Sequence, residues 1–255
     1  MMKPDISVII PVYNGQRFIA DAVNSVLSQI GVNLEALVID DCSDDETSEI
    51  VNSLADNDDR VIYIRTLSNQ GVAGARNTGV EAASGDWAAF LDADDKWHND
   101  KLFRQCELIQ QYEQIGKYPP LCYTGAYVMN DDGSFAGRVL KAPSRVTSQE
   151  LLFGNVIIAS TVMVRRRLLL EHPFEHGDLH EDYIEWFRIL DKYGPGVGVR
   201  QPLARYRLTN GSKSRNKLRS ARMAWRTYKY LGLSTPRALV SFAYYVRHGL
   251  RRYVF

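Results

Sequence analysis

Residues 87–95, Trp87-Ala-Ala-Phe-Leu-Asp-Ala-Asp-Asp95, join an apolar run of strand length to three carboxylates. Strand side chains alternate with a period of two, so Asp92 and Asp94 should leave the sheet on the same side. Ligands usually bind at the carboxyl ends of strands in open α/β sheets. Paired carboxylates there suit Mg²⁺ or Mn²⁺, which in turn can hold a phosphate. The alternative is an acidic turn that caps the following helix, for which Asp95 alone would suffice.

Further apolar runs of similar length alternate with helical patterns in the first half of the chain. Strands are expected at 6–10, 36–39, 61–64 and 87–91. This alternation predicts a parallel sheet with right-handed crossover connections. Ser43 followed by Glu46 has the pattern of a capping box, so a helix is expected to open there.

The pattern changes after about residue 115. Asn130-Asp-Asp-Gly133 predicts a hairpin turn. A strand is expected at 157–164 and a helix at 182–193. This half is expected to contain mixed strands and helices that form the other wall of a cleft.

The 255 residues have the composition of a globular protein, 45% hydrophobic and 24% charged. Residues 1–5 lead directly into the first predicted strand, so no secretory signal is expected. Cys42, Cys106 and Cys122 are far apart and form no Cys-x-x-Cys pair, which argues against a zinc site or a disulfide framework. We therefore expect a cytoplasmic protein with reduced thiols.

Opposite charges are concentrated in two parts of the chain. Residues 1–191 hold all 30 acids against 16 Lys and Arg, whereas residues 192–255 hold 15 Lys and Arg and no acid. The basic part should contact phosphates or an anionic membrane surface, or else neutralise the acidic part. Its last helical pattern suits a basic amphipathic helix on a membrane, or a helix packed on the domain. The apolar stripe is Leu239, Phe242, Ala243, Val246, Leu250 and Tyr253, accompanied by Arg237, Arg247, Arg251 and Arg252.

Six short motifs occur in order along the chain. They are Pro11-Val-Tyr-Asn14, Val38-Ile-Asp-Asp41, Asn69-Gln-Gly71 with Ala75-Arg-Asn77, Phe90-Leu-Asp-Ala-Asp-Asp95, Glu181-Asp182 and Tyr206-Arg207. Together they closely resemble the family 2 glycosyltransferases, inverting enzymes of GT-A fold that use nucleotide-diphosphate sugars. The resemblance is densest over residues 5–104 and continues more sparsely to about residue 214. It implies an α/β fold with a mostly parallel central sheet flanked by helices, followed by a basic helical extension.

The resemblance implies a donor site at the first strand ends. Asp41, with Asp40 beside it, is expected to accept the imide N–H of uracil, and Tyr13 to stack on the base. Pro11 is expected to fix the chain at the mouth of the cleft and to contact the donor. The alternative for Asp40 and Asp41 is an acidic turn that leads to the next helix.

A glycine-containing segment is expected to add to the donor site. Gly71 and Gly74 permit close backbone approach, and Arg76, with Asn77 beside it, is a fork donor suited to ribose or phosphate oxygens. Arg76 is also suited to a structural ion pair with an acid such as Asp92. The spacing matches neither a dinucleotide fingerprint nor a Walker loop.

The resemblance also implies a metal site and a general base. Asp94 would ligate Mn²⁺ or Mg²⁺, and Asp92 would join it or contact the ribose or a metal-bound water. The acceptor hydroxyl must lose a proton in a single in-line displacement. By similarity Asp182 takes that proton and Glu181 supports it, with His180 as a weaker candidate. Taken alone, the acidic pair would indicate only a helix N-terminus.

A late basic segment and several aromatic residues complete the expected site. Arg207 and Lys213 are expected to clamp the diphosphate. Many relatives have a histidine two positions after the arginine, but this chain has Thr209, which weakens the case for a ligand there. The aromatic residues expected to line sugar pockets, or else to pack in the core, are Trp97, Trp186 and Tyr183. Core packing is the expectation for Trp87 and Trp225.

We therefore expect an inverting, metal-dependent glycosyltransferase of cell-surface polysaccharide biosynthesis. It would move one sugar from a nucleotide-diphosphate donor, preferably UDP-linked, to a hydroxyl of a glycan or lipid-linked acceptor. Its expected parts are a nucleotide-sugar half (1–115), an acceptor half of the same domain (116–214) and the extension (215–255). The expected location is the cytoplasm, with peripheral contact to the inner membrane face, and no nucleic acid partner is expected. The Gln-x-x-Arg-Trp pattern of processive synthases is absent from the sequence, which favours single transfer.

Two alternative functions remain. A nucleotidyltransferase acting on sugar phosphates would need an early glycine-rich, basic loop, and residues 11–15 are not one. A non-catalytic sugar- or membrane-binding module is disfavoured by the presence of Asp94 and Asp182.

Overall fold

The computed structural model describes residues 3–175, 179–208 and 217–254. The strands are β1 (Ile6–Val12), β2 (Leu34–Asp40), β3 (Val61–Arg65), β4 (Trp87–Phe90), β5 (Lys96–Trp97), β6 (Leu121–Met129), β7 (Phe135–Leu140), β8 (Arg145–Val146), β9 (Met163–Arg165) and β10 (Gly196–Arg207). The helices are α1 (Ile19–Leu27), α2 (Thr47–Asn57), α3 (Gly71–Ala82), α4 (Lys101–Gln114), α5 (Ser148–Leu151), α6 (Arg166–Glu171), α7 (Glu181–Tyr193), α8 (Lys217–Tyr230) and α9 (Thr235–Val254), with a 3₁₀ helix η1 (Ala159–Thr161).

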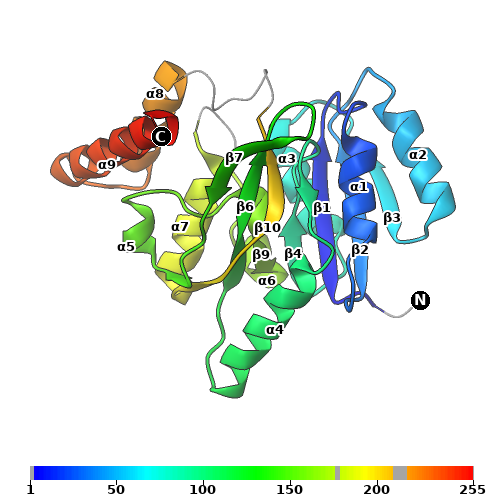
Figure 1. Ribbon diagram of the computed structural model, residues 1–255, viewed down its shortest axis with the longest axis horizontal. Helices are drawn as coiled ribbons and strands as arrows, with labels where there is room; N and C mark the ends of the chain where they lie inside the picture. The colour runs from blue at the N-terminus through cyan, green and yellow to red at the C-terminus, as the bar shows by residue number, and fades with distance from the viewer. Residues whose placement is uncertain (1–2, 176–178, 209–216, 255) are drawn as a thin grey trace.

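All of these strands belong to one sheet with helices on both faces (Figure 1). Its order is β3-β2-β1-β4-β9-β6-β10-β5, with β7 paired to β6 and β8 paired to β10. The strands β3, β2, β1 and β4 run parallel, as the alternating pattern predicts. The strand β9 is antiparallel to both β4 and β6, so both halves of the chain contribute to the same sheet.

Two cores form because neighbouring residues of a strand point to opposite faces. Val8 and Ile10 pack with residues of α1, α2 and α4, whereas Ile9 packs with residues of α3, α6 and α7. The helix α3 approaches β1 closely at Gly79, where a Cβ would lie 2.5 Å from Cγ2 of Ile9. The parallel strands are therefore apolar on both faces.

The second half agrees with the predicted pattern in part. The turn at 130–133 joins β6 to β7, with Gly133 at φ 86°, and α7 covers the predicted helix at 182–193. The predicted strand at 157–164 is wrong over most of its length. Only β9 pairs in the sheet, because η1 turns the chain just before it.

The predicted capping box at Ser43 and Glu46 is also wrong. The helix α2 begins at Thr47, and its N-terminus has no side-chain cap bond. The hydroxyl of Ser43 instead accepts the N–H of Asn14 at 2.9 Å. A complete capping box occurs at Thr147 and Glu150, where it opens α5.

The C-terminal helices α8 and α9 pack beside α5 and α7 (Figure 1). Ala238 and Ser241 of α9 are buried, and the ring of Phe242 lies 5.8 Å from that of Trp225. Leu239 and Val246, from the predicted stripe, are exposed. The side chains of the remaining predicted residues, Leu250, Arg251, Arg252 and Tyr253, lie outside the described part. Within the described ranges, no helix has the length and apolar character needed to cross a bilayer.

Candidate active site

Asp92, Asp94 and Asp95 lie in a loop, here the carboxylate loop, which follows β4 at the edge where the parallel strands end. Asp95 is buried; its Oδ2 accepts the hydroxyl of Ser160 at 2.5 Å and its Oδ1 accepts the N–H of Arg207 at 2.7 Å. Asp95 therefore does not cap a helix. The next helix, α4, begins after Asp100. Burial, together with the charges of the two other aspartates in the loop, raises the pKa of Asp95.

Asp92 and Asp94 have the properties of a cation site. Burial and the nearby charge of Asp92 raise the pKa of Asp94 to about 6, against an opposing effect of Arg207. A divalent cation would relieve this repulsion, and carboxylate oxygens suit Mn²⁺ or Mg²⁺. Among the described residues, no group of three or more His, Cys, Asp or Glu is placed to hold a metal. The pair therefore fits an ion that takes its other ligands from phosphates and water.

Arg76 connects the carboxylate loop to the acidic pair of α7. Its side chain is 4% exposed, and its Nη2 donates to Oδ1 of Asp92 at 2.9 Å while Nη1 donates to Oε1 of Glu181 at 3.2 Å. These bonds are those of the structural ion pair given above as the alternative, and the expected donor contact of Arg76 stays a prediction. Its Nε is buried and has no protein partner among the described residues.

Glu181 and Asp182 form the first turn of α7, preceded by His180 at the N-cap position. The N–H of Tyr183 donates to Oδ1 of Asp182 at 2.8 Å. Burial and the charge of Glu181 raise the pKa of Asp182, and Arg76 opposes that rise. The arginine is bonded to Glu181 and not to Asp182. Among the described residues, no hydrogen bond to the second oxygen of Asp182 competes with a substrate.

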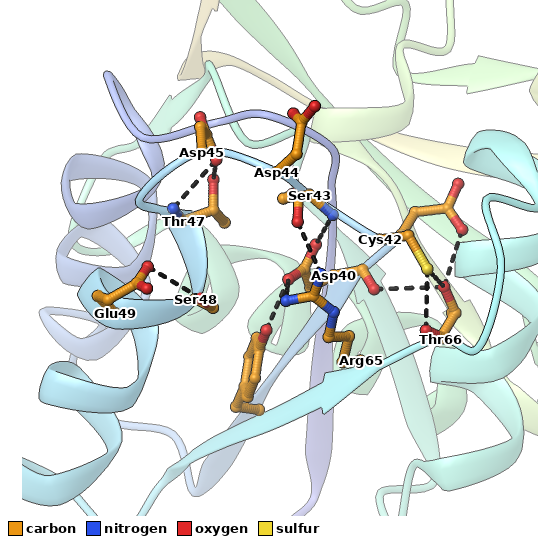
Figure 2. Close-up of polar contacts among 12 residues, drawn as sticks. Asp40, Cys42, Ser43, Asp44, Asp45, Thr47, Ser48, Glu49, Arg65 and Thr66 are labelled. Atoms are coloured by element: carbon orange, nitrogen blue, oxygen red, sulfur yellow. Dashed lines mark hydrogen bonds and ion pairs between the residues drawn. The ribbon is translucent and has the colours of Figure 1, made fainter.

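The two aspartates that end β2 differ in their surroundings. Asp40 is 0% exposed; its oxygens accept the N–H of Ser43 and the hydroxyl of Tyr63, and the Arg65 guanidinium lies 3.8 Å away. Figure 2 shows Asp40 enclosed between Ser43 and Arg65. These bonds give Asp40 a structural role at the end of β2, and its expected donor contact stays a prediction.

Asp41 holds the segment that leads into α3. Its Oδ1 accepts the N–H of Gln70 at 2.8 Å and the hydroxyl of Thr66 at 3.1 Å, and its Oδ2 accepts the N–H of Gly71 at 2.7 Å. A carboxylate has about four acceptor positions, so one position on Oδ2 remains for a ligand. Tyr13 is 54% exposed, as a stacking platform requires.

Three other residues expected to contact the donor make structural contacts within the protein. Pro11 is buried in β1, where it faces Ile39. Both polar atoms of the Asn77 side chain bond to the backbone of Phe174, each at 2.8 Å, so Asn77 joins α3 to the segment before α7.

Arg207 is 4% exposed and ends β10. Its expected contact with the diphosphate stays a prediction. Its Nε donates to the carbonyl of Asp94 and its Nη1 to the carbonyl of Asp131, each at 2.7 Å. Its guanidinium also lies 4.2 Å from the ring centre of Phe18. Lys213 and Thr209 lie outside the described residues.

The aromatic residues expected at sugar pockets are in the core. Trp186 is 0% exposed and contacts the rings of Phe90 and Phe174. Tyr183 is 5% exposed and its hydroxyl donates to the carbonyl of Leu151. Trp97 is 5% exposed and its Nε1 donates to the carbonyl of Ser160 at 2.6 Å. Core packing, the alternative for these residues, is thus what the structure shows.

Sequence reasoning missed Ser160. It lies 65 residues from Asp95, and a serine in an apolar segment carries no local signal of such a partner. The missed contact of Phe174 with Asn77 has the same cause, because it spans 97 residues.

Comparisons with known proteins agree with this geometry. The family model "Glycosyl transferase family 2" matches residues 7–169. The putative teichuronic acid biosynthesis glycosyltransferase TuaG of Bacillus subtilis is 33% identical over 98% of both chains. The Escherichia coli protein WfaP, a UDP-Glc:alpha-D-GlcNAc-diphosphoundecaprenol beta-1,3-glucosyltransferase, is 30% identical over 98% of this chain and 96% of its own.

Solved structures share the fold at lower identity. S. aureus TarS 1-349, in complex with UDP-GlcNAc, has a TM-score of 0.69 at 19% identity, over 88% of this chain and 65% of that chain. The mannosyltransferase PcManGT from Pyrobaculum calidifontis, in complex with GDP-Man and Mn2+, has a TM-score of 0.70 at 16% identity, over 95% and 70%. These likenesses confirm the expected GT-A fold. With the family match and the full-length relatives, they show that the chain is a glycosyltransferase and belongs to glycosyl transferase family 2.

Proposed function

We propose that this protein is a metal-dependent, inverting transferase that moves one sugar from a UDP-sugar to a hydroxyl of a lipid-linked glycan in cell-surface polysaccharide biosynthesis. The observation that carries the proposal is the Arg76 bridge, because it brings the Asp92–Asp94 loop and the Glu181–Asp182 pair into one cluster. The acceptor class and the donor are supported by the names of the relatives, which include a second UDP-Glc glucosyltransferase, WfgD of Escherichia coli.

The nucleotide would occupy the edge formed by the β1 and β2 loops. Tyr13 offers an exposed ring for stacking on the base. Asp41, fixed by two backbone N–H groups, offers its remaining acceptor position to the imide N–H. A TarS structure in complex with UDP-GlcNAc supports a uridine donor.

Asp94, with Asp92 beside it, would hold Mn²⁺ or Mg²⁺. When bound, such an ion neutralises negative charge on the departing diphosphate. The raised pKa of Asp94 and the Mn2+ in the PcManGT structure support this assignment. Arg76 fixes the direction of Asp92 through a buried bond, so the loop does not need to reorganise when the ion arrives.

Asp182 would act as the general base. Its raised pKa brings it closer to the working pH, where a base is most effective. As the acceptor oxygen bonds to the anomeric carbon, the bond to the diphosphate breaks on the opposite face and the proton passes to Asp182. Glu181, bonded to Arg76, orients this turn of α7.

A donor-hydrolysis and transfer assay tests the proposal. The wild-type protein with Mn²⁺ should release UDP from one of a set of UDP-sugars, faster with a synthetic GlcNAc-diphospho-lipid acceptor, and the product should have the inverted anomeric configuration. Asp94→Ala and Asp182→Asn should each reduce transfer by about 10²-fold or more. The control Asp56→Asn, at an exposed site on α2, should keep wild-type activity.

The other two functions predict different outcomes. Release of pyrophosphate from a nucleoside triphosphate and a sugar phosphate would identify a nucleotidyltransferase. Binding of sugars or vesicles without turnover of any donor would identify a non-catalytic module.

We further propose that α9 holds the protein at the inner membrane face, one of the two alternatives that the sequence leaves open. The helix packs on the domain through Ala238 and Ser241, yet leaves a second apolar face open, with Leu239 55% and Val246 41% exposed. Arg237 and Arg247 of the same helix are exposed, and residues 192–255 contain no acid. Such a face would bind an anionic bilayer surface in two ways, by burying its apolar side chains and by attraction of the basic charge to the lipid headgroups. A second copy of the same face would instead bring like charges together.

Vesicle sedimentation tests this contact. Binding should increase with the fraction of anionic lipid and fall with salt. The double variant Leu239→Asp/Val246→Asp should lose binding, whereas the control Ile115→Asp, at a 65% exposed site beyond α4, should retain it. Unchanged binding of the double variant would refute the contact.

A further inference from the structure

A buried serine from the second half of the chain contacts the carboxylate loop at two points. Ser160, in η1, is 0% exposed. Its hydroxyl oxygen accepts the N–H of Asp92 at 3.1 Å, and its hydroxyl proton is donated to Oδ2 of Asp95 at 2.5 Å. One hydroxyl can do both because it is a donor and an acceptor. It therefore fixes the residues on either side of Asp94.

The position of Ser160 is itself fixed by the core. Its carbonyl accepts Nε1–H of Trp97, which is 5% exposed, at 2.6 Å. The strand β9, which follows η1, pairs with β4, so the fold places Ser160 at the end of the strand that leads into the loop. A buried group held in this way can orient its neighbours without reorganising.

The other side of the loop is held by β10. Arg207 donates its N–H to Oδ1 of Asp95 and its Nε–H to the carbonyl of Asp94, both at 2.7 Å. Asp95 is thus bonded at each oxygen, to η1 on one side and to β10 on the other. These bonds leave only the carboxylates of Asp92 and Asp94 to face a ligand.

We propose that Ser160 is a positioning residue for divalent-cation binding by Asp94 and Asp92. The inference rests on the proposed metal-dependent transfer, and it assigns to Ser160 no contact with the ion, the donor or the acceptor. Groups that orient metal ligands typically account for 10–100-fold in metal affinity. Without the hydroxyl, the N–H of Asp92 and Oδ2 of Asp95 both lose their partner, and the loop is free to turn.

Mn²⁺ affinity of the full-length protein, measured in the presence of UDP from the free-ion paramagnetic resonance signal, tests the proposal. Ser160→Ala should raise the dissociation constant about 10–100-fold. The control Ser148→Ala removes the hydroxyl of another buried serine, on α5, which bonds to Asp191. It should change the dissociation constant for Mn²⁺ less than twofold. In steady-state assays Ser160→Ala should raise the Mn²⁺ concentration needed for half-maximal rate, while saturating Mn²⁺ should restore most of kcat.

The outcomes separate this inference from the function on which it rests. If the wild type binds Mn²⁺, Asp94→Ala does not, and Ser160→Ala binds as the wild type does, the inference is overturned and the metal site stands. If the wild type binds no Mn²⁺, the proposed metal use fails and the inference fails with it. Should Ser160→Ala not fold, Ser160→Cys decides, because it keeps the side-chain shape with a weak hydrogen-bonding group; wild-type affinity in that variant would overturn the proposal.

Discussion

Glu185, on α7, predicts an unusual dependence of stability on pH. The residue is 1% exposed, and neither carboxylate oxygen has a protein partner among the described residues. Burial raises its pKa from 4.5 to about 8, with Arg188 opposing the rise and Glu175 adding to it. At pH 7 the folded protein therefore keeps a proton that the unfolded chain has released. Because the folded state binds more protons, the free energy of unfolding falls by about 1.4 kcal/mol per pH unit between about 4.5 and 8.

Glu185→Gln removes this titration. The stability of the variant relative to the wild type should increase from pH 5 to pH 7 by up to about 3 kcal/mol, the full slope over two units. Urea unfolding of both proteins at pH 5, 6 and 7 measures the difference. Glu81→Gln, at an exposed position on α3, should shift stability by the same small amount at each pH. A difference for Glu185→Gln that does not vary with pH would refute the reasoning, since it would mean that the carboxylate ionises normally in the folded protein.

Three further substitutions test local contacts. Arg76→Lys keeps the charge but not the fork that reaches both Asp92 and Glu181, so kcat should fall about 10²-fold. A wild-type kcat would contradict the bridge. Thr147→Ala removes the capping box of α5 and should lower the free energy of unfolding in urea by about 1 kcal/mol. An unchanged free energy would show that the cap is dispensable. Gly79→Ala places a Cβ 2.5 Å from the side chain of Ile9 and should lower the free energy of unfolding by about 1–3 kcal/mol. A higher free energy of unfolding, as expected for alanine in a helix with open space around it, would show that α3 can shift.

The sequence was sufficient for the features that depend on local patterns. Apolar runs located the parallel strands, and the abrupt change from Leu91 to Asp92 located the edge at which the carboxylates gather. The start of α7 was correct to within one residue because acids favour a helix N-terminus. These features follow from the period and polarity of neighbouring residues.

Roles that depend on distant partners were not predictable in this way. The bond of Arg76 to Glu181 spans 105 residues, so no local pattern in the sequence indicates it. Local context misled at Ser43 as well. There the backbone N–H is taken by the Asp40 carboxylate, and Cys42 adopts φ 65°, so the hydroxyl turns toward the β1 loop. The same pattern at Thr147 caps a helix because its backbone is extended.

The charges of the cluster decide how a donor can approach it. Four acids, Asp92, Asp94, Glu181 and Asp182, outnumber the two guanidinium groups beside them. The charge of Arg76 is already shared by Asp92 and Glu181, and Arg207 lies beside Asp94. A diphosphate that enters this edge alone meets net negative charge, and burial strengthens the repulsion. The divalent ion that we propose at Asp94 would offset this repulsion. We therefore expect it to aid the binding of the donor as well as the departure of the diphosphate.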